Sequence, residues 1–328
     1  MNDPIDIIVP WVDSSDLVWE KKRARYSKNS SKELNGRERY RDYDTLKYLF
    51  RSIERYAAWV NKVYLVTDRQ TPTWLNLNND KIVVVNHNEY IAEAYLPTFN
   101  SNVIECNFFK IKKLSNNFIL FNDDMLFNGP TKERDFFINN TPRDSAIQAP
   151  VFPTKTGIDH TVVNNLAIIN DKFNKRKVIL KNWKKFYSVK YGKDNFKNMF
   201  LEPYGAFCGF VDFHVPIAYN KKLMTNVFKE NKIKFTETFK NKFRSNNDVS
   251  QWLFRYYQLC VGNFVPRRTS FGVYLTIDQV DKINETLKDE HIKLICLNDK
   301  RTENFDKYAS NVQKRLEEKF QKKSKFEL

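Results

Sequence analysis

FILFNDD, residues 118–124, is the stretch that decides the fold. Its four apolar residues, 118–121, are typical of a short buried strand, and Asn122, Asp123 and Asp124 follow without a spacer. In open α/β sheets, ligands bind beside the carboxyl ends of the strands. The stretch therefore predicts a core strand that delivers two acidic side chains to a candidate site.

Further apolar runs lie on the N-terminal side of this stretch, and helical patterns separate them. Strands that alternate with helices pair in parallel, and right-handed crossovers bring their carboxyl ends to one edge of the sheet. This part of the chain therefore predicts an α/β sheet with helices on both faces. We expect strands at residues 6–12 (DIIVPWV), 63–67 (VYLVT) and 81–85 (KIVVV), and helices at 42–59 and 102–114.

The second half of the chain is less regular. We expect a helix after Pro216, a helix at 249–260, a strand at 292–297 (IKLICL) and a basic helix at 307–320. Neither a repeat nor a flexible linker is visible, so we expect this half to pack onto the first. The expected regions are a first core part at 1–130, a helical, irregular region at 131–290, and a final strand and helix at 291–328 that complete the core.

Composition excludes several classes of protein. In 328 residues, 41% hydrophobic and 15% aromatic side chains suffice for a substantial core, which excludes a disordered or collagenous chain. Only 8 glycines are present, and neither the G-x-G-x-x-G nor the P-loop pattern occurs, which excludes the standard dinucleotide and P-loop sites. The 4 cysteines are far apart, which indicates reduced thiols rather than a zinc site or a disulfide framework.

The chain carries a formal net charge of +16, with 55 Lys and Arg against 39 Asp and Glu. This balance points to an anionic partner, such as a nucleotide, a nucleic acid, a membrane surface or an acidic polymer, or to a solvated Lys-rich surface. Neither a signal peptide nor an apolar run long enough to span a membrane is visible. We therefore expect a cytoplasmic protein with peripheral contact to the anionic inner face of the plasma membrane.

Asp123 and Asp124 are adjacent carboxylates, which repel each other unless a cation or a proton separates them. A divalent metal that bridges nucleotide phosphates is the usual reason for such a pair. The alternative is an Asx-rich turn. A second acidic loop follows the first expected strand, where Asp13 and Asp16 either cap a helix that begins near Leu17 or hold a ribose.

Basic and polar residues gather ahead of the expected helices. Arg37, Arg39 and Arg41 precede Asp42, and arginine can bind a phosphate through two parallel hydrogen bonds. Asp42 is itself a candidate helix cap. The other polar stretches are Asn100-Ser101 ahead of Glu105, His214 ahead of Pro216, and Arg244 to Asp248. In the first of them Asn100 or Ser101 is a candidate helix cap, and in the last Asp248 is.

Taken in order, these motifs resemble the Stealth family of sugar-1-phosphate transferases. That family includes bacterial capsular polysaccharide phosphotransferases and the catalytic subunit of the animal lysosomal-enzyme GlcNAc-1-phosphotransferase. The similarity covers nearly the whole chain in four blocks. The first block is residues 6–16 (DIIVPWVDSSD), and the second combines 37–75, which opens with RERYRDYD, with 96–105 and 118–127. The third combines 163–176 with FHVP (213–216) and FRSNNDVS (243–250). The fourth combines ICLND (295–299) with the tail SKFEL (324–328).

The resemblance implies a GT-A-like fold, a Rossmann-like sheet of the nucleotide-sugar transferase type. It also implies an enzyme, a transferase of phosphorus-containing groups. Such an enzyme moves a hexose-1-phosphate from a UDP-sugar, such as UDP-GlcNAc, to a hydroxyl of an acceptor glycan, forms a phosphodiester and releases UMP. The implied process is capsule or exopolysaccharide synthesis, with Mg²⁺ or Mn²⁺ as cofactor and a free or lipid-linked oligosaccharide or polysaccharide as acceptor. Residues 1–130 would then hold the nucleotide-sugar, and 131–290 would face the acceptor.

Two alternative functions remain open. A conventional glycosyltransferase would share fold and donor but release UDP. A basic polyanion-binding module would bind polyanions in a salt-sensitive way and turn over no nucleotide-sugar. We expect no nucleic-acid partner. The animal enzyme carries large inserted recognition modules for which this chain has no room, so we expect no protein acceptor.

The chemistry of these residues, together with the resemblance, suggests roles for the site residues. Arg41 and Arg244 would clamp phosphates, Asp123 would bind the metal with Asp299 as a second ligand, and Asp124 or His214 would be the general base. Two positions depart from the animal enzyme, which has Asn in place of Asp13 and His in place of Ser245. Donor-binding candidates are Trp11, Val12, Asp13, Arg41, Asp42, Asp68, Asn100, Ser101, Glu105 and Asn122, and catalytic candidates are Asp123, Asp124, His214 and Arg244.

Overall fold

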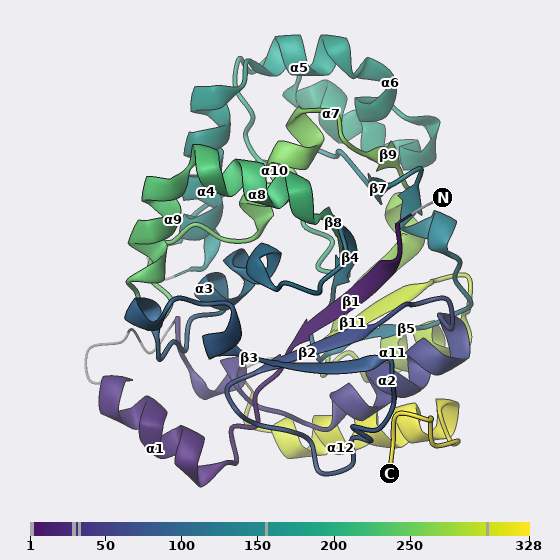
Figure 1. The fold of residues 1–328 in the computed structure, drawn as a ribbon. Coiled ribbons are helices and arrows are strands. Elements are labelled where there is room, and N and C mark those ends of the chain that lie inside the picture. The colour runs from purple at the N-terminus through teal and green to yellow at the C-terminus, as the bar shows by residue number, and fades with distance from the viewer. Residues whose placement is uncertain (1–2, 28–30, 32–33, 155–156, 300–301) are drawn as a thin grey trace.

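A five-stranded sheet lies at the centre of the molecule (Figure 1), whose computed structural model describes residues 3–27, 31, 34–154, 157–299 and 302–328. β1 to β4 pair in parallel, and β8 pairs antiparallel with β4 at one edge. This confirms the expected α/β sheet with mainly parallel strands. The spatial order is β3 (Ile82–Asn86), β2 (Val63–Thr67), β1 (Ile5–Pro10), β4 (Asn117–Leu120) and β8 (Ile217–Asn220).

The carboxyl ends of three central strands meet at one edge of this sheet. Pro10 at the end of β1 is in register with Val66 of β2, and Ile8 is in register with Leu120 at the end of β4. The loops that follow these strands are therefore neighbours. The turn at 122–124 lies at this edge, as expected from its position after an apolar strand.

A second sheet begins directly after that turn. It has three strands, in the order β10 (Gly272–Thr276), β11 (Leu294–Asn298) and β5 (Met125–Phe127). β11 runs parallel to β10 and antiparallel to β5. The acidic turn thus joins the two sheets. A third small sheet contains β6 (Phe137–Ile138), β7 (Thr141–Asp144) and β9 (Val265–Pro266).

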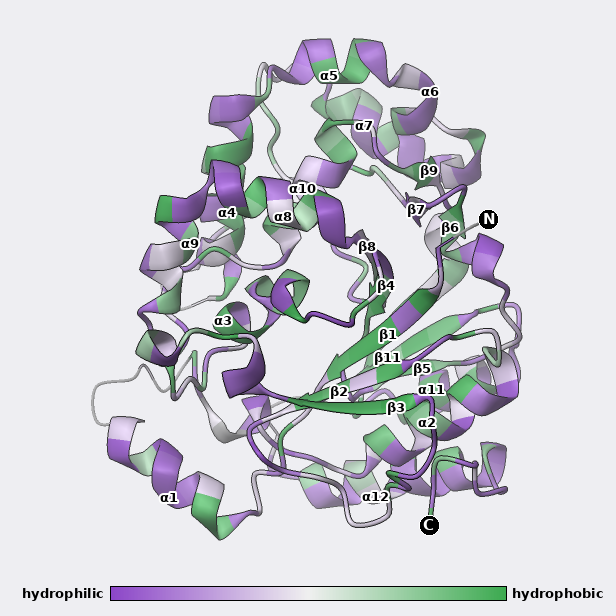
Figure 2. Ribbon diagram, in the orientation of Figure 1, coloured by the Kyte–Doolittle hydropathy of each residue, from purple (hydrophilic) through white to green (hydrophobic). Residues whose placement is uncertain are grey.

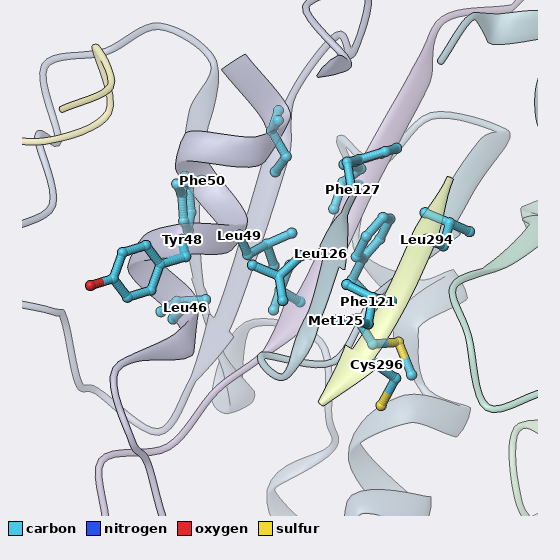
Figure 3. Close-up of a cluster of buried hydrophobic side chains, with 14 of the residues drawn as sticks. Leu46, Tyr48, Leu49, Phe50, Phe121, Met125, Leu126, Phe127, Leu294 and Cys296 are labelled. Atoms are coloured by element: carbon cyan, nitrogen blue, oxygen red, sulfur yellow. The ribbon is translucent and has the colours of Figure 1, made fainter. Parts of the chain in front are cut away.

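One face of the central sheet packs with the second sheet against α2 (Thr45–Tyr56), α11 (Val280–Lys288) and α12 (Phe305–Lys319). Figure 3 shows Leu49 of α2 directed toward Leu126 of β5, with Phe121 and Phe127 beyond them. Leu49 and Leu126 are fully buried. Burial of a leucine side chain contributes about 1.5–3 kcal/mol each, so this cluster anchors the acidic turn to the core.

The other face of the central sheet is covered by a second cluster of helices. Alternate residues of β1, such as Ile7 and Ile8, belong to opposite clusters, so helices cover both faces of the sheet as expected. The helices of this second cluster are α3 (Ser101–Cys106), α4 (Asp159–Lys172), α5 (Lys175–Lys181), α6 (Trp183–Phe186), α8 (Lys221–Glu230), α9 (Lys232–Phe239) and α10 (Trp252–Cys260).

Hydropathy follows this layered arrangement. Figure 2 shows the central strands in green, whereas the outer turns of α12 and of α1 (Leu17–Tyr26) are largely purple. The 4 cysteines are free thiols, as expected. Within the described part of the chain, no helix has both the length and the apolar character that crossing a bilayer requires.

Two sequence expectations for secondary structure were wrong. The segment after Pro216 forms strand β8 rather than a helix, because its backbone completes the sheet beside β4, and helix α8 begins only after Asn220 caps it. The helix expected at 102–114 is shorter. α3 ends at Cys106, where the Asn107 amide donates to the Val103 carbonyl (2.7 Å), and a 3₁₀ turn follows at Phe108–Lys110.

The structure confirms some of the predicted helix caps and not others. Asp16 caps α1 by accepting from the backbone N–H of Val18 at 2.8 Å. Asn100 caps α3 by accepting from Asn102 N at 3.0 Å. Asp42 and Asp248 do not cap the helices that follow them, because α2 begins after Asp44 and α10 begins after Gln251.

Candidate active site

A cavity of 720 Å³ opens at the carboxyl edge of the central sheet. Its walls come from the ends of β1, β2 and β4, from α3, from the loop before β8, and from the end of β11. The site is therefore assembled from both halves of the chain. Of the predicted residues, those that line it are Trp11, Val12, Arg41, Asp68, Ser101, Glu105, Asn122, Asp123, Asp124, His214, Arg244 and Asp299.

The acidic turn contributes a pair of closely spaced carboxylates to this cavity. Burial raises the pKa of both Asp123 and Asp124, and the charges of Asp124 and Asp42 raise that of Asp123 further. Asp124 Oδ2 accepts from the Asn298 amide at 3.1 Å. Asp124 Oδ1 is buried and accepts no conventional hydrogen bond from the described residues, although the Cys296 thiol lies beside the carboxylate. The described residues thus offer few hydrogen-bond donors to balance the negative charge of these two carboxylates.

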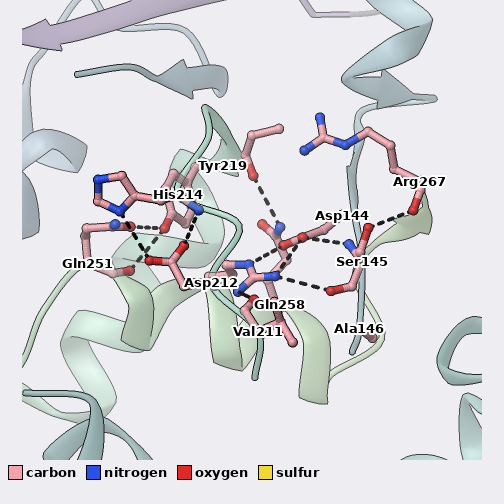
Figure 4. Close-up of polar contacts among 12 residues, drawn as sticks. Asp144, Ser145, Ala146, Val211, Asp212, His214, Tyr219, Gln251, Gln258 and Arg267 are labelled. Carbon is pink, nitrogen blue, oxygen red and sulfur yellow. Dashed lines mark hydrogen bonds and ion pairs between the residues drawn. The ribbon is translucent and has the colours of Figure 1, made fainter. Parts of the chain in front are cut away.

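A histidine–aspartate pair, His214 and Asp212, also lines the cavity and belongs to the loop before β8. The backbone at His214 is left-handed, with φ of +46°, and its N–H donates to Asp212 Oδ1 at 2.9 Å. This turn brings His214 Nδ1 to 3.4 Å from Asp212 Oδ2 (Figure 4). The imidazole packs edge-on against the Tyr274 ring.

The charge of His214 follows from these neighbours. Burial opposes protonation, but the hydrogen bond to Asp212 and the charges of Asp212, Asp124 and Glu105 outweigh it, so that the pKa of His214 is raised above its usual value. His214 therefore remains a cation to a higher pH than a free imidazole.

A buried ion pair supports the loop that carries His214. Arg255 of α10 donates to both carboxylate oxygens of Asp144, at 2.8 and 3.0 Å, and to the carbonyl of Val211 at 3.0 Å. Figure 4 shows Asp144 and Val211 beside the Asp212–His214 turn. Because both charges of the pair are buried, loss of one partner would leave the other uncompensated, at a cost of about 3–5 kcal/mol.

Two arginines form the basic side of the cavity. Arg244 Nε and Nη2 donate to Ser101 Oγ at 3.1 and 2.8 Å, whereas its Nη1 is buried and has no partner among the described residues. Desolvation and the charge of Arg244 together lower the pKa of Arg39. Two guanidinium groups that repel each other in a concave site are suited to an anion that binds between them.

The Glu105 carboxyl is influenced by the charges of Arg244 and His214. Burial raises the pKa of its carboxyl to about 7, against the opposing effects of Arg244, His214 and Ser101. Its charge state therefore changes near neutral pH, and Glu105 links the basic side of the cavity to the histidine.

The structure joins two residues that the sequence placed in separate roles. Arg41 donates to both carboxylate oxygens of Asp299, at 2.8 and 3.0 Å, and its guanidinium lies 3.7 Å from the Phe305 ring centroid. The predicted phosphate clamp and the predicted second metal ligand therefore form one ion pair at the cavity wall.

Three predicted donor-binding residues are not part of the cavity lining. Asn100 is fully buried and donates to Asp248 Oδ2 at 2.8 Å, which ties α3 to the loop that carries Arg244. Asp42 accepts from Trp11 Nε1 at 2.7 Å. Asp13 accepts from the backbone N–H of Ser15 at 2.8 Å. These three side chains hold neighbouring residues and loops in place rather than lining the cavity.

Some residues of the cavity were not assigned to the site from sequence. Asp212 and Tyr274 line it, and so does Arg39, which was named only as part of a basic stretch. So does His87, whose pKa is lowered to about 4 by burial, with Asp68 acting in the opposite direction. The sequence held one signal, the spacing of Asp212 two residues before His214, because a side chain at that distance can accept from the backbone N–H of a turn.

The acidic turn is the part of the site that fits a divalent cation. The described residues contain no cluster of three or more His, Cys, Asp or Glu side chains able to enclose a metal. The adjacent carboxylates of Asp123 and Asp124, with the unpartnered Oδ1 of Asp124, do suit a hard cation that takes its remaining ligands from water and phosphate oxygens.

Comparison with known proteins places this geometry in context. Residues 39–144 match the sequence model of Stealth protein CR2, conserved region 2. The chain is 43% identical to the capsular polysaccharide phosphotransferase WcwK of Streptococcus pneumoniae, over 99% of this chain and 98% of that protein. It is 40% identical to the exopolysaccharide phosphotransferase cps2G of Lactiplantibacillus plantarum (98% and 96% covered) and 35% identical to the receptor polysaccharide phosphotransferase WefC of Streptococcus gordonii (100% of both).

Proposed function

Because the chain belongs to the Stealth family and is a transferase of phosphorus-containing groups in polysaccharide synthesis, we propose that it moves a hexose-1-phosphate from a UDP-sugar to a hydroxyl of an acceptor glycan. One observation carries the proposal. A single cavity holds a carboxylate pair at one strand end together with Arg39, Arg244 and a histidine whose pKa is raised.

In the proposed reaction, the acceptor hydroxyl oxygen attacks the β-phosphorus of the UDP-sugar. The bond from that phosphorus to the oxygen that bridges the two phosphates breaks, UMP leaves, and a phosphodiester forms. The anomeric C–O bond stays intact, so the configuration of the sugar is retained in the product. A GT-A-like arrangement, in which the nucleotide-sugar lies at the carboxyl edge of the central sheet, is consistent with the position of the cavity.

The basic side of the cavity would hold the diphosphate. Arg244, fixed by Ser101, and Arg39 supply two guanidinium groups whose mutual repulsion an anion relieves. His214, whose protonated form is favoured by the hydrogen bond and the charge of Asp212, would add a third cation. Donors fixed before the substrate arrives stabilise the developing charge without reorganisation, and this is the largest effect that such a site can supply.

The acidic side would handle the acceptor proton and the cofactor. Asp124 is our candidate base, because its Oδ1 is unpartnered within the described chain, whereas the neighbours of His214 raise its pKa and favour its protonated form. Asp123 would hold Mg²⁺ or Mn²⁺, which when bound neutralises phosphate charge. Asp299 instead holds Arg41 through both of its oxygens, so Asp123 is the ligand that we retain.

Arg41→Ala is expected to raise the donor KM and to lower the free energy of unfolding by about 1–3 kcal/mol, because the Asp299 side chain, only 8% exposed, loses its ion pair with Arg41. Arg55→Ala is the matched control, since Arg55 is also an arginine, is half-exposed, and lies in α2, the helix that follows Arg41 in the sequence. Donor KM and thermal melting of both variants check this. Equal effects of the two substitutions would mean that general charge, rather than the Arg41–Asp299 pair, attracts the donor.

The donor KM is expected to rise as the pH rises through the raised pKa of His214, because the phosphate contact needs the protonated imidazole. Asp212→Asn removes a group that raises this pKa, so the same rise should begin at lower pH. His291→Ala, at an exposed site, should leave the profile unchanged. The opposite result, an acidic limb in kcat that His214→Ala abolishes while donor affinity is unchanged, would assign His214 as the base.

The nature of the released nucleotide tests the proposed function. The purified chain would be incubated with a panel of UDP-sugars, including UDP-GlcNAc, an acceptor glycan and Mg²⁺ or Mn²⁺, and the nucleotides separated by chromatography. We expect UMP with at least one donor, and no turnover in EDTA. Release of UDP would identify a conventional glycosyltransferase, and activity that survives EDTA would remove the metal role of Asp123.

A further inference from the structure

Large apolar side chains are exposed together on the helices at one end of the molecule. This end contains α5, α6, the 3₁₀ helix η7 (Val189–Asp194) and α7 (Asn195–Leu201), and it lies opposite α12 (Figure 1). We call the group the α5–α7 surface. It consists of Leu180, Trp183, Val189, Phe196, Met199 and Phe200, which are between 56% and 93% exposed.

These side chains belong to one packed unit rather than to separate loops. The Asn198 amide of α7 donates to the Phe186 carbonyl of α6 at 2.6 Å. Lys175 of α5 donates to the Tyr204 carbonyl beyond α7 at 3.0 Å. The unit is fixed to the rest of the fold by Asn198, whose side-chain oxygen accepts from the backbone N–H of Gln148 at 2.7 Å. The exposure of the apolar residues is therefore a property of a folded surface.

The same segment concentrates positive charge. Residues 172–204 contain 10 Lys and Arg and only 2 acidic residues, Asp194 and Glu202, so a tenth of the chain carries half of its net charge of +16. Eight of these cations are exposed: Lys172, Arg176, Lys177, Lys181, Lys184, Lys190, Lys193 and Lys197. Figure 2 shows both hydrophilic and hydrophobic residues on α5, α6 and α7.

We propose that the α5–α7 surface docks on an anionic lipid bilayer, with its apolar side chains in the headgroup region and its lysines against acidic headgroups. Exposed aromatic and aliphatic side chains set among cations are the combination that binds proteins to such surfaces without spanning them. A second copy of the chain fits less well, because apposing two such surfaces would bring like charges together.

The inference does not depend on which bond the enzyme breaks. It bears on the proposed reaction only by placing the cavity near a bilayer, where a lipid-linked acceptor would lie. A failure of membrane binding and a failure of UMP release are therefore separate results.

Co-sedimentation of the full chain with vesicles tests this surface. In 0.1 M NaCl, we expect binding to vesicles of equal phosphatidylglycerol and phosphatidylcholine, little binding to pure phosphatidylcholine, and loss of binding in 0.5 M NaCl. Leu180→Ser with Phe200→Ser, and separately Lys181→Glu with Lys184→Glu, should each lower the partition coefficient by about tenfold or more.

Matched variants elsewhere on the surface control for general effects. Leu77→Ser with Ile233→Ser changes two equally apolar, exposed residues, and Lys282→Glu with Lys288→Glu changes two exposed lysines of α11. Both should bind as the unaltered chain does, and thermal melting should show that every variant is folded.

Three results would overturn the proposal. They are no binding of the unaltered chain to either vesicle, equal losses in the surface variants and their controls, or a dimer in sedimentation velocity that Leu180→Ser with Phe200→Ser dissociates while vesicle binding is absent. The last result would assign the surface to a second copy of the chain.

Discussion

Asp123→Asn is expected to lower kcat by about 10³-fold or more while leaving the enzyme folded. The substitution keeps the size of the side chain but removes one of the two adjacent charges at the end of β4. In the proposed mechanism that charge is needed to hold the cation, so its loss removes transition-state stabilisation rather than packing. Release of nucleotide at saturating donor measures the effect.

The same substitution should raise stability when metal is withheld. Burial and the charges of Asp124 and Asp42 raise the pKa of Asp123 in the folded state. A carboxyl whose pKa is raised on folding contributes stability below its unfolded pKa, near 4, and loses it as the pH rises through the folded value. At pH 7 in EDTA, Asp123→Asn should therefore melt at a higher temperature than the unaltered chain.

Asp80→Asn is the control, because Asp80 is exposed and lies far from the acidic turn in the sequence, before β3. It should change neither kcat nor the melting temperature. An Asp123→Asn enzyme with kcat close to that of the unaltered chain would remove Asp123 from the catalytic machinery.

Arg244→Ala should lower kcat/KM by about 10³-fold, the second large effect. Its guanidinium is held by two hydrogen bonds to Ser101 Oγ and has a buried, unpartnered Nη1 among the described residues. Arg244→Lys should recover little activity, because an ammonium cannot contact Ser101 and a phosphate oxygen with the same planar geometry. Steady-state kinetics with varied donor measure both variants.

Arg315→Ala provides the comparison, since Arg315 lies on α12, where its Nη1 forms an ion pair with Glu318 of the same helix. A loss in Arg244→Ala no larger than that of Arg315→Ala would contradict the phosphate role. A double variant with Arg39→Ala should lose less than the product of the two single losses, because both arginines act on one anion.

The central strands could be predicted from sequence because their signal is local. VYLVT matches β2 residue for residue, and FILF differs from β4 by one position. Each is a short run of buried residues, which needs no knowledge of its neighbours. The strand after Pro216 carries no such signal, because IAYN becomes a strand only through pairing with β4, about a hundred residues earlier in the chain.

The site could be predicted only in part, for a related physical reason. The acidic turn is local, and its place at a strand end is implied by the sequence beside it. Three arginines in RERYR cannot be told apart by spacing, yet Arg41 pairs with Asp299 whereas Arg39 faces Arg244. Asp212 acquires its role through a left-handed turn at His214. A local sequence pattern predicts neither the contacts of these arginines with distant segments nor this backbone conformation.

The destination of the β-phosphorus tests the central claim most directly. A UDP-sugar labelled at that phosphorus would be incubated with enzyme, metal and acceptor glycan, and the label followed into glycan and nucleotide. We predict that the label moves with the sugar into a phosphodiester on the acceptor, and that the nucleotide released is unlabelled UMP. Label that stays on released UDP, with a phosphorus-free glycoside as product, would contradict the account.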